Sequence, residues 1–229
     1  MAEKCSRILT GYLQNHYPQQ EITVDQVLLT LTKSNEDYWK KYLIDNVPSE
    51  IYSDHTRTSK KSFETITVPL LEQSDLSNWI ELLDMRDANL AIGLTTVFGC
   101  LVHRYTRQDE VVMGIQIVSN SKCFQEPLVL KIDLSTCDTF VDLLEHTKSE
   151  LHDNFLHSEV LLKTLEKDLN LVQLPNKNPF FLVGFVYIDR LDNYQDQMNQ
   201  YCDIIARVKL LSNGTHELSF EYNKELYSR

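Results

Sequence analysis

The segment from Leu90 to Ile117 has the clearest pattern of apolar and polar residues in the chain. The residues up to Tyr105 are almost continuously apolar and predict a buried helix, which the polar residues 106–110 should end. The apolar run that begins at Val111 predicts a strand directly after this turn. A buried helix that leads through a short turn into a strand indicates an α/β architecture.

Apolar residues recur at helical spacing in several further segments. They predict helices at residues 3–16, 35–45, 74–83, 139–154 and 157–169, and a short helix after Thr23 or Asp25. Ser34 is the expected N-cap of the helix at 35–45, because its side chain can accept a hydrogen bond from a free backbone N–H.

Alternating or continuous apolar runs predict the strands. These lie at residues 63–70, 111–118, 128–134, 179–188, 204–211 and 217–222. Asn213-Gly214 predicts a hairpin between the last two strands, and the polar residues 49–61 predict a surface loop. We expect an α/β protein, an α+β two-layer sandwich with the helices packed mainly on one face of a mixed sheet.

Composition and charge narrow the functional classes. With 229 residues, 42% of them hydrophobic, the chain suits one domain, or one domain with a short appendage. A net charge of -11 argues against partners such as nucleic acid or an anionic membrane, which require basic patches. No apolar run reaches the ~18 residues of a membrane span, and the charged N-terminus is unlike a signal peptide. Five widely spaced cysteines without a CxxC pair indicate reduced thiols and a cytoplasmic protein.

Seven segments, in order, carry a resemblance to a known family. They are Tyr38 to Leu43, Phe63 to Leu83, His103 to Gly114, Thr139 to Leu144, His157 to Leu169, Pro179 to Tyr187 and Leu218 to Leu226. In this order and spacing they resemble the condensation domains of nonribosomal peptide synthetases, over residues 38–227.

The resemblance implies a fold and a division of the chain. The family's full domain is a V-shaped pair of chloramphenicol-acetyltransferase-like lobes, and all seven segments resemble its C-terminal lobe. We therefore expect a short helical extension at residues 1–34 and a single condensation-like lobe at 35–229. The family's reaction forms an amide between two carrier-bound acyl groups, so the implied partners are a peptidyl carrier protein and an adenylation domain. Phosphopantetheine would then reach the chain only on a carrier, with no cofactor bound directly.

The family's catalytic motif, HHxxxDG, is missing from this sequence. The seven histidines are His16, His55, His103, His146, His152, His157 and His216, and no two are adjacent. The resemblance places that motif in the N-terminal lobe. We therefore assign no catalytic, cofactor-binding or metal-binding residue. The segment Ser119 to Pro127 is also shorter than the family's crossover.

Other candidate residues have two interpretations each. His146 and Glu150, with His152 and His157 nearby, have the spacing of a metal site but also that of an exposed helix face. Cys100 is either a nucleophile or, as we expect, a small core residue. Trp39 and Trp79 either line a groove or pack in the core.

Three functional hypotheses follow. The chain is a docking scaffold that no longer catalyses, or an acyltransferase or amide-forming enzyme that needs oligomerisation or a separate N-terminal lobe supplying the histidine. The third hypothesis is a remnant that folds poorly because an isolated lobe exposes apolar surface.

Overall fold

The structure is a computed structural model that describes residues 24–70, 73–119, 127–158, 162–169, 176–189 and 198–228. The expected helix at 3–16 and most of the short segment 119–127 lie outside these residues. The chain forms two compact units, residues 1–44 with 159–169, and residues 45–158 with 170–229. Each is described by itself. The predicted boundary after residue 34 stays a prediction.

The first unit contains helices α2 (Val24–Tyr42) and α6 (Leu162–Asp168). Helix α2 runs without a break through Ser34, so the predicted N-cap at this residue and the separate helix at 35–45 are wrong. No proline or glycine interrupts residues 24–42, and a serine alone does not end a helix. Trp39 is buried and packs edge-to-face on Tyr42, with the ring centroids 5.5 Å apart.

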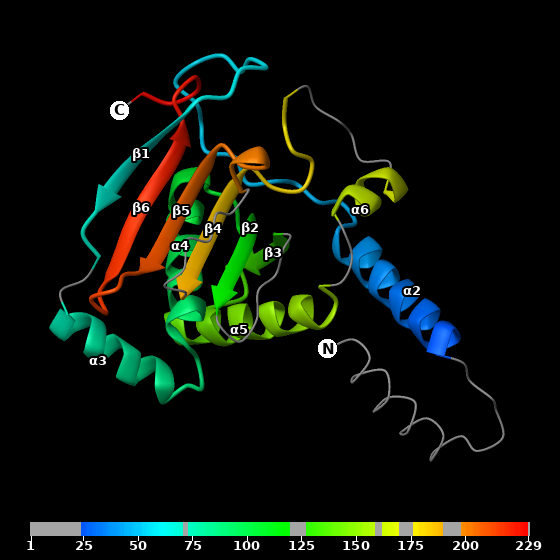
Figure 1. The fold of residues 1–229 in the computed structure, drawn as a ribbon, viewed down its shortest axis with the longest axis horizontal. Coiled ribbons are helices and arrows are strands. Elements are labelled where there is room, and N and C mark those ends of the chain that lie inside the picture. Colours follow the sequence, from blue (N-terminus) through cyan, green and yellow to red (C-terminus); the bar gives the residue numbers. More distant parts are fainter. Residues whose placement is uncertain are drawn as a thin grey trace. The chain divides into compact units, whose positions relative to one another are not determined.

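The second unit is built on a six-stranded sheet with the order β1-β6-β5-β4-β2-β3. The strands are β1 (Phe63–Val68), β2 (Glu110–Ser119), β3 (Leu128–Asp133), β4 (Val183–Asp189), β5 (Ile204–Leu210) and β6 (His216–Asn223). Strand β4 pairs in parallel with β2 and β5, and every other pairing is antiparallel. The predicted mixed sheet is confirmed (Figure 1).

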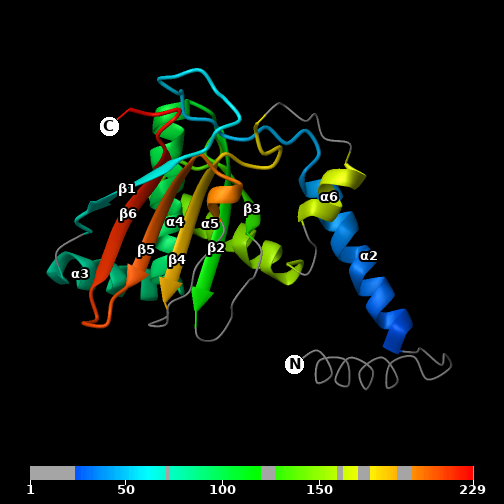
Figure 2. The same cartoon turned by 45° about the horizontal axis from the view of Figure 1, so that its top comes forward.

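The described part of the second unit also contains the α-helices α3 (Gln73–Asp84), α4 (Leu90–Thr106) and α5 (Phe140–Leu156), and the short 3-10 helix η1 (Met198–Gln200). Helices α4 and α5 lie on the same face of the sheet (Figures 1 and 2). Phe98 of α4 meets Phe185 of β4 with ring centroids 5.7 Å apart, so odd-numbered residues of β4 face the helices. The predicted α+β two-layer sandwich is therefore confirmed.

The opening helix, turn and strand are also confirmed. Asn89 caps α4 by accepting a hydrogen bond from the N–H of Ile92 at 3.0 Å. Arg107 has a left-handed backbone with φ 61°, and its N–H donates to the carbonyl of His103. This conformation ends the helix three residues before β2 begins at Glu110.

The hairpin between β5 and β6 has the predicted place but a longer loop. Leu210 pairs with His216, so residues 211–215 form the loop. Gly214 has φ 81°, which favours glycine, while Oδ1 of Asn213 accepts a hydrogen bond from the N–H of Thr215 at 3.0 Å. Asn213 thus contributes a side-chain hydrogen bond to this turn, and Gly214 contributes the left-handed backbone conformation.

Candidate functional site

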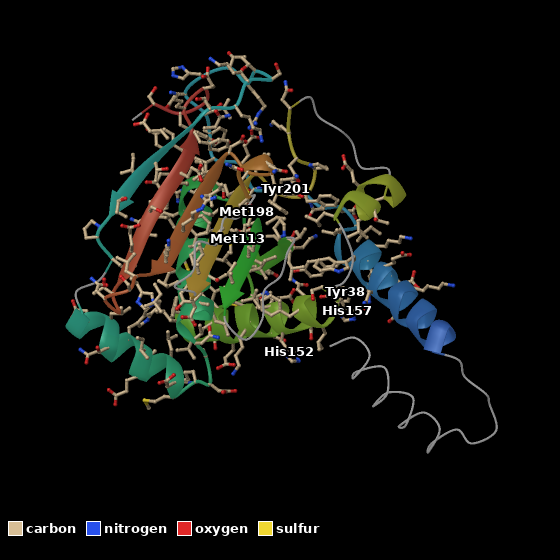
Figure 3. All side chains as sticks on the ribbon, in the orientation of Figure 1. Tyr38, Met113, His152, His157, Met198 and Tyr201 are labelled. Atoms are coloured by element: carbon tan, nitrogen blue, oxygen red, sulfur yellow. The ribbon has the colours of Figure 1, made fainter. Side chains whose placement is uncertain are left out.

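Two of the segments that carry the resemblance meet at Gly114 on β2. A Cβ atom at this position would lie 2.4 Å from Cε2 and 2.8 Å from Cζ of Phe181. Phe181 is fully buried and lies just before β4. Tyr201, labelled in Figure 3, contacts the same ring with centroids 5.9 Å apart. Gly114 therefore leaves the space that an aromatic side chain from a distant segment fills.

Asn178 holds the backbone before β4 in a turn. Its Oδ1 accepts hydrogen bonds from the N–H of Phe181 at 3.2 Å and from that of the preceding residue at 2.8 Å. From the other side, Nδ2 of Asn46 donates to the carbonyl of Pro179 at 3.1 Å. These bonds occupy backbone groups that a strand would use. Strand β4 accordingly begins at Val183, and the prediction that it begins at 179 is wrong.

A network of four charged residues lies next to this turn. Nη2 of Arg57 is 2.6 Å from Oδ2 of Asp203 and 3.1 Å from Oε1 of Glu50. Nζ of Lys177 is 2.5 Å from Oε2 of the same glutamate. The side chain of Asp203 is only 2% exposed, so its charge depends on Arg57 for compensation. The network joins the loop 45–62, the turn before β4 and the start of β5.

The charged network should make the stability of the protein depend on pH. Burial alone would raise the pKa of Glu50, but hydrogen bonds from Lys177 and Arg57 outweigh it, so the pKa lies below its ordinary value of 4.5. A carboxylate with a lowered pKa contributes stability that is present above its unfolded pKa and is lost as the pH falls through its folded pKa. We therefore expect the advantage of the wild type over Glu50→Gln to shrink below about pH 4.5.

Urea unfolding of both proteins between about pH 3 and pH 7 measures this difference. Glu81→Gln, at an exposed position of α3, is the matched control and should show no such dependence. A difference between wild type and Glu50→Gln that stays constant across this range would contradict the assigned role of Glu50.

The predicted surface loop at 49–61 is confirmed, since it contains no helix or strand and most of its residues are exposed, but its start is fixed to the rest of the unit. Ser49 is fully buried, and its Oγ accepts a hydrogen bond from the N–H of Val112 at 2.9 Å. The hydroxyl of Tyr227 donates to the carbonyl of Ile51 at 3.0 Å. Strand β2 and the C-terminal residues of the second unit are therefore both joined to this loop. Its composition gave no sign of these contacts because all of them are long-range.

The histidines of the described residues do not gather at one place. His103 lies 2.7 Å (Nδ1) from the carbonyl of Gln108, and His157 lies 2.8 Å (Nδ1) from that of Asp153. Nε2 of His146 accepts a hydrogen bond from the backbone of β3. Figure 3 labels His152, which is exposed on the last part of α5, and His157, the C-cap that follows this helix. Within the described ranges, no three His, Cys, Asp or Glu side chains are placed to hold a metal ion.

The sequence gave no signal for one pair that the sheet brings together. The hydroxyl of Tyr187 on β4 lies 3.4 Å from Nε2 of His216 on β6. Burial raises the pKa of Tyr187 to about 12 and lowers the pKa of His216, although Asp189 nearby opposes the second effect. Both side chains are therefore neutral near pH 7. The two side chains can share a hydrogen bond, and the tautomer of His216 sets which of them is the donor.

The described cysteines do not have the environment of nucleophiles. We predicted Cys100 to be a small core residue, but it is only half-buried on α4. This burial raises the pKa of its thiol. Cys202 is fully buried, and the thiol of Cys137 donates to the carbonyl of Asp133. A nucleophilic cysteine requires the opposite shift, toward the thiolate.

An apolar groove of about 840 Å³ opens beside helices α3 and α4. Its apolar walls include Trp79, Leu82, Val97, Phe140 and Leu218, from α3, α4, α5 and β6. Three of these side chains are 38–46% exposed, which is high for residues of their size. Trp79 is half-buried: it lines this groove, and its ring also lies against Gly93 of α4, so each of its two interpretations holds in part.

The chain was compared with known families and structures. The family model described as "Condensation domain" matches residues 25–229. The chain belongs to the condensation domain family. The resemblance found in the seven segments is thereby confirmed, and the family match begins earlier than the resemblance does, within α2.

Curated relatives are large synthetases. The chain is 22% identical to "Surfactin synthase subunit 1" of Bacillus subtilis (strain 168) over 195 residues, which cover 79% of this chain and 5% of that protein. It is 26% identical to "Tyrocidine synthase 2" of Brevibacillus parabrevis over 164 residues, which cover 67% of this chain and 5% of that protein. The chain therefore spans a small part of these relatives.

Solved structures confirm the fold. The X-domain in complex with OxyB from teicoplanin biosynthesis matches with a TM-score of 0.71 at 14% identity, covering 87% of this chain and 49% of that one. The four-domain nonribosomal peptide synthetase AB3403 matches with a TM-score of 0.70 at 16% identity, covering 86% of this chain and 18% of that one. None of the helices in the described part of the chain has both the length and the apolar character to cross a membrane.

Proposed function

We propose that this chain is the C-terminal lobe of a condensation-type domain and acts without catalysis, as a scaffold for carrier and adenylation domains of a nonribosomal peptide synthetase. The family assignment supports the setting. One observation carries the non-catalytic part: no two of the seven histidines are adjacent in the sequence, so HHxxxDG is missing. The described histidines lie apart and most contact nearby backbone, which suits structural roles.

The proposed partners follow from the chemistry of the family. A peptidyl carrier protein would bring phosphopantetheine with its acyl group, and an adenylation domain would load it. This chain would bind no cofactor directly. A cytoplasmic location remains a prediction from the cysteines, and we expect no binding to nucleic acid or to membranes.

A binding experiment and a transfer experiment test the proposal together. The purified chain is titrated with carrier and adenylation domains from the same synthetase system, and association is measured by calorimetry. The chain is then incubated with two acyl-loaded carriers, and amide formation is followed by mass spectrometry, with an intact condensation domain as positive control. We expect association without amide formation. A loss of association with every partner contradicts the scaffold, and amide formation by the chain alone contradicts the absence of catalysis.

A second candidate function is an enzyme completed by another lobe. One observation favours it. The chain covers only about half of similar solved structures, for example 49% of the X-domain chain. Adding a separately expressed N-terminal lobe with an intact HHxxxDG motif tests it. Amide formation that appears only in the mixture, and is lost when the second histidine of that motif is replaced by alanine, supports this alternative. Solution mass measurements decide whether a homo-oligomer forms instead.

A further inference from the structure

The two edges of the sheet differ in how they are protected. At the β3 edge, helix α5 supplies side chains to the outward backbone groups. Nδ2 of Asn154 donates to the carbonyl of Val129 at 2.9 Å, and Nε2 of His146 accepts from the N–H of Asp133 at 3.3 Å. Such coverage prevents another chain from pairing with an edge strand.

The β1 edge has no such coverage. The carbonyl of Ser62 accepts a hydrogen bond from the N–H of Lys224 at 2.8 Å, so residue 62 faces β6, as do residues 64, 66 and 68. The backbone groups of Phe63, Thr65 and Thr67 therefore point away from the sheet. Within the part of the chain that the structure describes, no residue forms a hydrogen bond with these groups.

Apart from Glu64, the sequence of β1 lacks the usual protection of an edge strand. Residues 63–68 read FETITV, with no lysine, arginine or proline among them. Thr65 and Thr67 are exposed on the face opposite the helices. The strand is six residues long and rich in β-branched residues, which favours pairing with another strand.

The apolar groove lies on the helix side of this same edge. Val68 pairs with Leu218, which lines the groove, and Ile66 and Val68 share its face of the sheet. Leu82 is 46% exposed and Val97 is 44% exposed in the groove wall. A strand added beside β1 would direct every second side chain toward this apolar surface.

Charge distinguishes between possible occupants. Glu64 lies on the groove side of β1, and Asp75 lines the groove. A second copy of this chain would bring a further net charge of -11 to the same place. A segment with a cationic residue opposite Glu64 meets a complementary charge instead.

We propose that β1 is a docking edge for an extended segment of a partner protein, which adds a seventh, antiparallel strand to the sheet. The segment has apolar side chains at alternate positions, facing the groove, and a lysine or arginine facing Glu64. This binding mode goes beyond the proposed scaffold function and does not depend on a synthetase context.

A short peptide with this pattern tests the proposal on the full chain. Acetyl-VTITKT-amide places Val opposite Val68, Ile opposite Ile66 and Lys opposite Glu64 in antiparallel register. Binding is measured by calorimetry and by the fluorescence of Trp79, which lines the groove. The other tryptophan, Trp39, is buried. The variant Trp79→Phe measures the background fluorescence that Trp39 contributes.

Proline at the edge is the decisive variant. Thr65→Pro removes an outward N–H that β6 does not use, so the sheet itself keeps its hydrogen bonds. Thr65→Val is the matched control, because it keeps the N–H. We expect the peptide to bind the wild type and Thr65→Val alike, and to bind Thr65→Pro at least about tenfold more weakly. A peptide methylated on the backbone nitrogens of its first two threonines should also bind about tenfold more weakly to the wild type.

Several outcomes would overturn the proposal. Failure of the peptide to bind the wild type, equal binding to Thr65→Pro, or equal binding of the methylated peptide each excludes strand addition. If Thr65→Pro does not fold, the methylated peptide on the wild type still decides. If the molecular mass of the wild type in solution rises to that of a dimer with concentration, while Thr65→Pro stays monomeric, a second copy of the chain occupies the edge.

Discussion

Replacing Gly114 by alanine is expected to lower the free energy of unfolding by about 2–3 kcal/mol. Three atoms of the Phe181 ring lie within 2.4–2.8 Å of the site where the new Cβ would stand. The ring is rigid and fully buried, so a small rotation of one end of the side chain cannot relieve the clash. Either the whole Phe181 side chain or the backbone of β2 must shift. Urea unfolding followed by circular dichroism measures the loss.

Gly99 provides the matched control on α4. A Cβ at Gly99 would lie 2.7 Å from Cδ1 of Ile132, which is the far end of a flexible side chain. Alanine also favours a helix over glycine by about 0.5–1 kcal/mol, so Gly99→Ala should change the stability by less than about 1 kcal/mol. Equal losses at both glycines would contradict the role given to the aromatic ring.

A double-mutant cycle assigns the cost to the contact itself. Phe181→Leu removes the ring that the new methyl group would meet. The loss in the Gly114→Ala, Phe181→Leu double variant should therefore be smaller than the sum of the two single losses. Additive losses would show that the strain arises elsewhere. A cooperative transition in the wild type would also contradict the remnant hypothesis, which expects poor folding.

Replacing Arg57 by methionine is the second change with a large expected effect, a loss of about 3 kcal/mol. Methionine keeps much of the packing volume but leaves the carboxylate of Asp203, 2% exposed, without its cation. Removing one partner of a buried ion pair costs more than removing both, because an uncompensated charge remains. Thermal and urea unfolding measure the loss.

The double variant Arg57→Met, Asp203→Asn tests this explanation. It removes the stranded charge along with its partner, so it should be more stable than Arg57→Met alone. Lys60→Met is the control, because Lys60 is exposed and its ion pair with Glu225 lies at the surface. We expect a loss below about 1 kcal/mol there. A double variant no more stable than Arg57→Met would contradict the buried-charge argument.

The turn at Asn178, the ring of Phe181 and the glycine of β2 lie at one end of the sheet. The catalytic histidines of the family belong to a motif that this sequence does not contain.

Most elements of the second unit could be predicted from the sequence, but their ends were less certain. Helix α4 and strand β2 follow from a long apolar pattern with a polar turn, and the structure places them almost where expected. Two predicted element ends were wrong, one because side-chain hydrogen bonds form a turn and the other because no residue interrupts a helix. Asn178 shortens the predicted strand before β4, and the unbroken helix α2 passes through the predicted cap at Ser34.

Candidate sites show the same limit. Every histidine can be read from the sequence, but the contact between Tyr187 and His216 cannot. Only the pairing of β4, β5 and β6 brings these two side chains together. The sequence predicts the loop at 49–61, but it gives no sign of the charged network to which Arg57 and Glu50 of this loop belong. Ion pairs between residues more than a hundred positions apart leave no periodic signal, because periodicity records only local geometry.

By itself, the sequence determined the family, the class of fold and the absence of the paired histidines, since each depends on residue identity and local order. Only the tertiary structure decided which edge of the sheet is open. Both β1 and β3 are edge strands, but among the described residues α5 bonds to the outward backbone of β3 through Asn154 and His146, whereas no hydrogen bond reaches the outward backbone of β1. That difference arises from the placement of a helix over a sheet, which is set by packing across the whole unit.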